Sequence, residues 1–109
     1  MWLFTSGGFV SIVQDRDDKD NLIVRARVKN HLLALFPKAK VTETLEADYR
    51  FRSTLRRKAV EKVVAKQVAS ITYDNFKRSI GDRGYHDACL NVWDTMRGLQ
   101  NKLNYSHSP

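Results

Sequence analysis

Two short segments carry arginine on every second position, and this spacing restricts the local structure more than any other feature of the chain. Residues 22–28 read LIVRARV, and residues 48–54 read DYRFRST. Side chains two positions apart point about 200° apart around an α-helix but to the same side of a β-strand. The pattern therefore predicts two strands that carry four arginines on one sheet face: Arg25, Arg27, Arg50 and Arg52.

The residues between these arginines are predicted to face the core. They are Val24, Ala26, Tyr49 and Phe51. If both segments belong to one sheet, its apolar face lies under helices and its other face carries the arginines. The rings of Tyr49 and Phe51 then point away from the arginines. On this interpretation the basic face contacts phosphate without stacking on bases.

The rest of the pattern predicts an α+β protein, with an antiparallel sheet of about four strands and helices packed on one face. The expected order is β-β-β-α-β-α-α. A hairpin over residues 2–14 turns at the Ser-Gly-Gly of residues 6–8, and residues 41–45 are a weaker candidate for an extra strand. Helices are expected over 31–36, about 56–70 and about 83–102.

Polar residues before the helical segments are the expected N-caps. Asn30 is expected to cap the first helix, Ser53 or Thr54 the second and Asp82 the last. Thr72 together with Asn75 indicates one further capped turn, closed by Gly81. We expect one α+β domain over residues 1–103, followed by a frayed tail over residues 104–109.

The basic charge of the chain favours an anionic partner. Lys and Arg number 19 against 12 Asp and Glu, which gives a net charge of +7 over 109 residues. This excess attracts nucleic acid, anionic lipid or an acidic protein, although a charge of this size also serves solubility alone. A single cysteine excludes an intramolecular disulfide, and no apolar run is long enough to span a membrane. A cytoplasmic location is the default expectation.

The arginine pairs have two interpretations. Like charges at this spacing repel, so acids such as Glu43 or Asp48 are expected to pair with them, or the guanidinium groups lie flat in water. Alternatively, a phosphate-bearing ligand binds them, because guanidinium matches phosphate oxygens bidentately. A second basic cluster at the start of the long central helix offers another anion site or a solvated turn: Arg56, Arg57 and Lys58.

Candidate chemistry is sparse. His86 and Cys89 share one side of the last helix, but a zinc site needs further ligands that the sequence lacks. Cys89 falls in an apolar stripe, where a lone cysteine is usually a small core residue. The aspartates of residues 15–20 lack the glycine and glutamate of a calcium loop. We therefore expect no metal, cofactor or catalytic residue. The sequence favours a binding protein over an enzyme.

The chain resembles a group of short bacterial hypothetical proteins. The likeness rests on MWLFT with GF, VRAR, DYRFR and YDNFK segments, in the same order along nearly the whole chain. It implies a cytosolic single-domain protein and no particular activity. It also draws attention to a set of polar and aromatic positions: Arg25, Arg27, Tyr49, Arg52, Tyr73, Asn75, Phe76 and Lys77.

The leading hypothesis is a non-enzymatic module that binds nucleic-acid backbone or another polyanion through the four strand arginines. Possible extensions of this surface are Tyr73, Asn75, Lys77, Arg56, Arg57, Lys58 and His86. One alternative is an inhibitor or adaptor of phage or plasmid type that meets an acidic protein surface. Another is a small phosphodiester hydrolase. No membrane partner is expected, and the edge of the N-terminal hairpin allows a homodimer.

Overall fold

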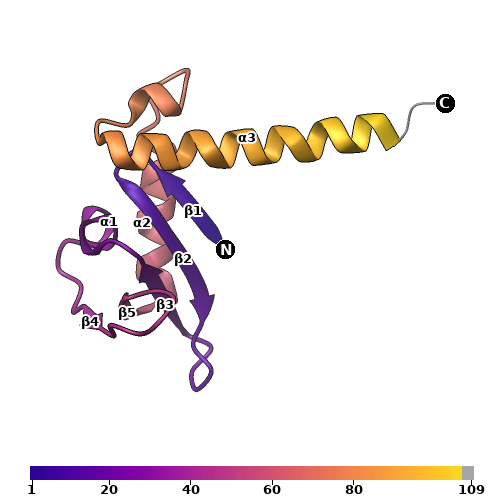
Figure 1. Cartoon of the computed structure of the whole chain (residues 1–109). Helices are drawn as coiled ribbons and strands as arrows, with labels where there is room; N and C mark the ends of the chain where they lie inside the picture. The colour runs from indigo at the N-terminus through magenta and orange to yellow at the C-terminus, as the bar shows by residue number, and fades with distance from the viewer. Residues whose placement is uncertain (107–109) are drawn as a thin grey trace. The chain divides into compact units, whose positions relative to one another are not determined.

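The computed structural model describes residues 1–106, with side chains through Leu103. The chain separates into two compact units, Met1–Thr72 and Tyr73–Pro109, and each is described by itself (Figure 1). The single domain expected over residues 1–103 stays a prediction.

The first unit is built on a five-stranded antiparallel sheet with the spatial order β1-β2-β3-β5-β4. Its strands are β1 (Trp2–Thr5), β2 (Gly8–Gln14), β3 (Asn21–Ala26), β4 (Thr42–Glu43) and β5 (Phe51–Arg56). The predicted α+β architecture is confirmed, and the weak candidate at residues 41–45 supplies the short edge strand β4. Each strand pairs antiparallel with its neighbours in the sheet.

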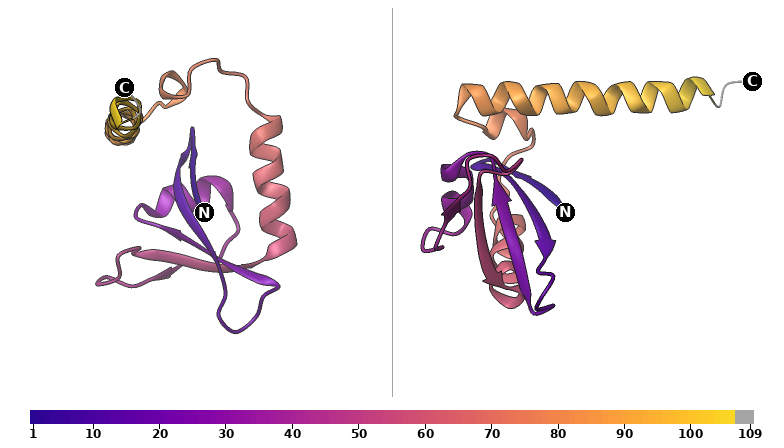
Figure 2. Two further views of the ribbon diagram at one scale, coloured as in Figure 1. Left: turned by 90° about the vertical axis from the view of Figure 1, so that its right-hand side faces the viewer. Right: turned by 60° about the horizontal axis from the view of Figure 1, so that its bottom comes forward.

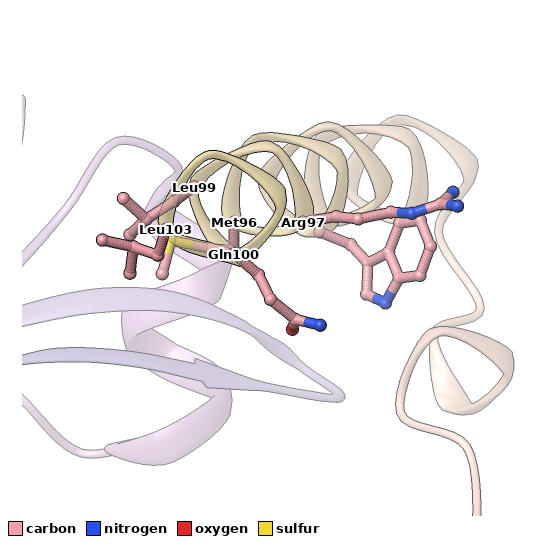
Figure 3. A pocket seen from close by; sticks show the side chains of 6 residues that line it. Met96, Arg97, Leu99, Gln100 and Leu103 are labelled. Carbon is pink, nitrogen blue, oxygen red and sulfur yellow. The ribbon is translucent and has the colours of Figure 1, made fainter. Parts of the chain in front are cut away.

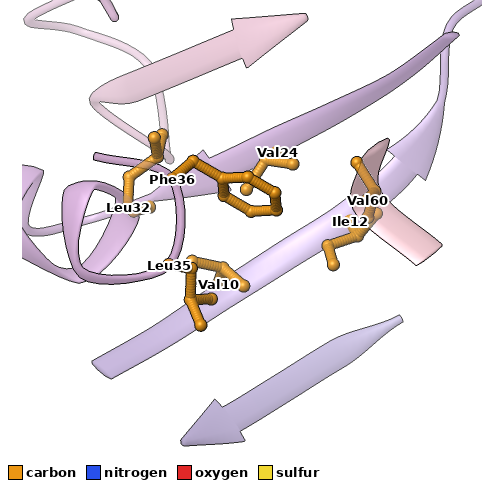
Figure 4. Packing of buried hydrophobic residues seen from close by; sticks show 8 residues of the cluster. Val10, Ile12, Val24, Leu32, Leu35, Phe36 and Val60 are labelled. Carbon is orange, nitrogen blue, oxygen red and sulfur yellow. The ribbon is translucent and has the colours of Figure 1, made fainter. Parts of the chain in front are cut away.

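Helices α1 (Lys29–Leu35) and α2 (Arg57–Ala69) both contact the sheet on its apolar face (Figure 2). Alternate residues of the central strands and a few residues from or just after these helices form the core (Figure 4): Val10, Ile12, Val24, Ala26, Leu32, Leu35, Phe36 and Val60. Burial of such side chains is worth about 1.5–3 kcal/mol each, and this stabilises the pairing of sheet and helices.

The second unit contains the short helix η1 (Lys77–Ser79) and the long helix α3 (Arg83–Ser106). Asp82 caps α3, because its Oδ2 accepts the N–H of Tyr85 at 2.8 Å. Asn75 likewise accepts the N–H of Arg78 at 3.1 Å. The predicted cap at Asp82 is confirmed. A helical turn also forms after Thr72 and Asn75 as predicted, but its N-cap is Phe76, which makes no side-chain cap hydrogen bond. α3 runs beyond the predicted end at residue 102, and residues 107–109 of the predicted tail lie outside the described part.

Two other predicted caps are wrong. Asn30 lies inside α1, which begins at Lys29 after an extended Val28. Ser53 and Thr54 lie within β5, and α2 begins directly after that strand, with Arg56 as its N-cap. Pairing with β3 extends β5 as far as Arg56, opposite Asn21. The hydrogen bonds and side-chain packing of this strand pair stabilise the structure more than a serine or threonine N-cap on α2 would.

Candidate functional site

The registers of the sheet place four residues in one row across four strands. Trp2 pairs with Ser11, Ser11 pairs with Arg25, and Arg25 pairs with Arg52. Paired residues of antiparallel strands point to the same side of the sheet. This side is opposite the one that buries Val24, so it is the face that α1 and α2 leave open within the first unit. We call it the open face.

Arg25 is held on the open face by uncharged neighbours. Its Nη2 donates to Oγ of the buried Ser11 at 2.6 Å, and its guanidinium carbon lies 4.6 Å from the centre of the Tyr49 ring. Its Nε is buried and has no acceptor among the described residues. No carboxylate of the described side chains forms an ion pair with Arg25 or Arg27. The charge of Arg25 is therefore not compensated by an acid in this part of the chain.

Tyr49 joins three of the predicted arginines. Arg27 lies 4.3 Å from the centre of its ring, and Arg52 donates through Nε to its carbonyl oxygen at 3.3 Å. Tyr49 is only 4% exposed, so these contacts are made at a buried ring. Cation–π contacts of this kind stabilise by about 0.5–2 kcal/mol. We call this set the arginine cluster: Arg25, Arg27, Tyr49 and Arg52.

The prediction that Tyr49 points away from the arginines is wrong. β5 begins at Phe51, so Tyr49 precedes the strand and the strict alternation of side chains does not apply to it. Phe51 pairs with Ala26 and lies on the core side as predicted. The chain enters β5 in a way that turns the Tyr49 ring toward Arg25 and Arg27.

Two of the arginines have the acidic partners that the sequence suggested. Arg50 pairs with Glu43 at 3.0 Å, and Arg52 pairs with Asp48 at 3.4 Å. Arg50 also lies over the Phe51 ring at 5.8 Å, and its contacts are separate from those of the arginine cluster. Such exposed ion pairs are worth at most about 1 kcal/mol, so an incoming phosphate can replace the Asp48 contact of Arg52.

An aromatic group that was not predicted from the sequence lies on the open face beside the arginines. Phe4 and Phe9 are paired across β1 and β2, with ring centres 4.5 Å apart in a stacked arrangement. Trp2 meets Phe9 edge-on at 5.9 Å and is 68% exposed. The alternation of Trp2 and Phe4 with Leu3 was the signal that could have placed them on one face.

Two residues of the second basic cluster make contacts within the first unit. Arg57 donates to the Lys19 carbonyl oxygen at 2.7 Å and to Gln14 Oε1 at 2.6 Å, which ties the start of α2 to the loop after β2. Lys58 lies 3.6 Å from Glu61 on the surface of α2. The contacts of Arg57 give it a structural role at the start of α2.

The remaining candidates belong to the second unit. Lys77 lies 4.4 Å from the centre of the Trp93 ring, Tyr73 contacts Phe76, and His86 Nδ1 lies 3.2 Å from Asp87 Oδ1. Burial raises the pKa of the Cys89 thiol, and a hydrogen bond with Tyr85 opposes this rise. A buried thiol with a raised pKa is a poor nucleophile.

Two further findings concern the described residues only. No group of three or more His, Cys, Asp or Glu side chains there is arranged to hold a metal ion. None of the helices in that part of the chain combines the length and apolar character needed to cross a membrane.

No family model matches the chain, and no curated protein or solved structure matches it. The geometry of the open face is therefore the basis for assigning a function to this chain.

Proposed function

We propose that this protein binds single-stranded nucleic acid on the open face of its sheet. The observation that supports this most directly is the register that places Arg25 opposite Arg52, on the side of the sheet that carries Trp2, Phe4 and Phe9. Single-strand binding surfaces combine a basic path for the backbone with aromatic rings for the bases. Both components are present here on one sheet face.

The arginine cluster supplies the backbone site. Two arginines directly opposite each other on neighbouring strands destabilise the sheet by a few tenths of a kcal/mol or more. A phosphate between them removes this repulsion and accepts bidentate hydrogen bonds from the guanidinium groups. Arg27 is exposed and Arg25 and Arg52 are partly exposed, so all three are available to a ligand.

The aromatic group supplies the base site. The exposed Trp2 and the stacked pair of Phe4 and Phe9 present rings to bases that are already unpaired. Bases in a duplex are stacked on each other and cannot use such rings, which favours a single strand. An acidic protein surface would use the arginines but would gain little from Trp2.

The backbone site is tested by replacing the two opposed arginines. For an Arg25→Gln, Arg52→Gln double variant we expect about tenfold weaker binding of a labelled 15-residue oligothymidylate at low salt, because two phosphate contacts are lost. The slope of log affinity against log salt should also become shallower by about 1.4, that is about 0.7 per contact on a single strand. Fluorescence anisotropy over a salt series measures both.

A Lys62→Gln, Lys66→Gln variant is the matched control, since it removes the same charge from exposed positions on α2. Its affinity for the oligonucleotide should lie within about twofold of the parent value, because salt screens charges that do not contact the ligand. Equal losses in the two double variants, or unchanged binding in the arginine variant, would exclude the arginine cluster as the binding site. In the second case an acidic protein becomes the better candidate ligand.

The base site is tested by Trp2→Ala. We expect a loss of about 1–3 kcal/mol of binding energy, or roughly 5- to 150-fold in affinity, because stacking on one base is removed. The salt slope should stay unchanged, since no phosphate contact is lost. Anisotropy with the same oligonucleotide and with its duplex gives both quantities. A variant that binds the single strand like the parent would show that the ligand contacts phosphate alone.

A further inference from the structure

The apolar residues of α3 follow a heptad repeat. They are separated alternately by four and three residues: Tyr85, Cys89, Val92, Met96, Leu99 and Leu103. In heptad notation Cys89, Met96 and Leu103 occupy a positions, and the other three occupy d positions. This is the pattern of a helix that pairs with another helix along one side. We call these six residues the α3 seam.

Most of the α3 seam is not covered by the other described residues of the second unit. Tyr85 and Cys89 are buried, but the later seam residues and the adjacent Trp93 are 40–56% exposed. All side chains from Asn91 to Leu103 are exposed. Figure 3 shows Leu99, Leu103 and the sulfur of Met96 gathered on one side of the helix, with Arg97 extending away from them. An isolated helical stretch of this length is marginal in water, so it needs a partner for its apolar side.

The charges of α3 indicate what kind of partner fits. All its charged residues up to residue 101 occupy the outward b and f positions: Arg83, Asp87, Asp94 and Arg97. The positions that flank the seam carry Ala88, Trp93, Thr95 and Gln100, besides His86 and one basic residue, Lys102. Charged residues at the positions that flank a seam normally determine which helix pairs with it, because opposite charges on two different helices attract each other. Since α3 offers almost no charge there, an identical helix meets no repulsion along most of the seam.

We propose that α3 pairs with α3 of a second copy of this chain through the exposed part of the seam. At roughly 100 Å² for each of five half-exposed side chains, two copies bury about 1,000 Å², which reaches the lower limit for a specific interface. The expected dimer is therefore reversible and forms at micromolar or higher concentration. This inference does not depend on the proposed nucleic-acid binding.

The test compares two variants that add the same charge to α3. Leu99→Lys places a cation inside the seam, whereas Asn101→Lys places it at an outward f position two residues away. Sedimentation equilibrium from about 1 µM to about 1 mM should show the parent approaching twice the 12.6 kDa of one chain. The dissociation constant of the Asn101→Lys dimer should lie within about threefold of the parent value. That of the Leu99→Lys dimer should be at least about a hundredfold larger.

The helical signal in far-ultraviolet circular dichroism provides a second readout. Dilution should lower it in the parent, because the uncovered part of α3 loses its partner. A parent that stays monomeric up to about 1 mM would overturn the proposal. So would a dimer that Leu99→Lys leaves intact, because the interface would then lie elsewhere, for example at the exposed edge of β1.

Discussion

Replacement of Tyr49 by alanine is expected to lower the free energy of unfolding by about 3–5 kcal/mol, the usual cost of removing a large buried ring. The ring is 4% exposed and lies 6.4 Å from the Phe9 ring. Arg25 and Arg27 both lie against it. Its loss leaves a cavity and removes the surface that positions two guanidinium groups. Urea denaturation followed by circular dichroism measures the change.

Tyr49→Phe is the matched control, because it keeps the ring and both cation–π contacts. We expect its free energy of unfolding to lie within about 1 kcal/mol of the parent value, since only a hydroxyl is removed. A cost of less than about 1 kcal/mol for Tyr49→Ala would contradict the structural role assigned to this ring.

Gly8→Ala is the second change with a large expected effect, a loss of about 3 kcal/mol in the free energy of unfolding. Gly8 begins β2 with a φ of +154°, which side-chain-bearing residues rarely adopt. A Cβ at this position would also overlap the ring of His31. Strain and overlap act together, so either the turn after β1 or α1 has to move. Thermal and urea unfolding of the variant give the size of the effect.

A double-mutant cycle separates the two causes. His31→Gly is destabilising by itself, because His31 Nδ1 accepts the N–H of Phe9 at 3.2 Å and because glycine weakens the helix α1 in which residue 31 lies. In the His31→Gly background, however, the Cβ, Cγ and Cδ2 atoms of His31 that overlap the added methyl group at residue 8 are all absent. We expect Gly8→Ala to cost about 1–2 kcal/mol less there than in the parent. Strictly additive effects would show that backbone strain alone makes glycine necessary at this position.

The sequence predicted the parts of the fold that depend on local alternation. The hairpin of residues 2–14 could be recognised from two runs of strand-forming residues on either side of Ser-Gly-Gly. The strand around residues 22–28 could be recognised from arginines on every second position. The same alternation correctly assigned Arg25 and Arg52 to one side of their strands. The cap at Asp82 was also predictable, since its contact with Tyr85 spans only three residues.

The predictions failed where an element ends. The period of two says nothing about where a strand begins, so Tyr49 was assigned to the wrong side although it lies only two residues before β5. The caps expected at Ser53 and Thr54 failed for a related reason, because pairing with β3 extends the strand past them. At Ser53 and Thr54 a hydrogen-bond ladder between distant segments outweighed a weak local preference, whereas Tyr49 lies outside that ladder.

The amino-acid sequence by itself determined an α+β chain with a strongly basic character and arginines on every second position of two short segments. Arg25 and Arg52 lie within β3 and β5, whereas Arg27 follows β3 and Arg50 precedes β5. Only the tertiary structure decided that Arg25 lies opposite Arg52, that Tyr49 turns toward both neighbouring guanidinium groups, and that Trp2 belongs to the same face. The direction of a side chain follows from its own backbone. Its neighbours follow from strand register, which long-range pairing and burial of the shared core select.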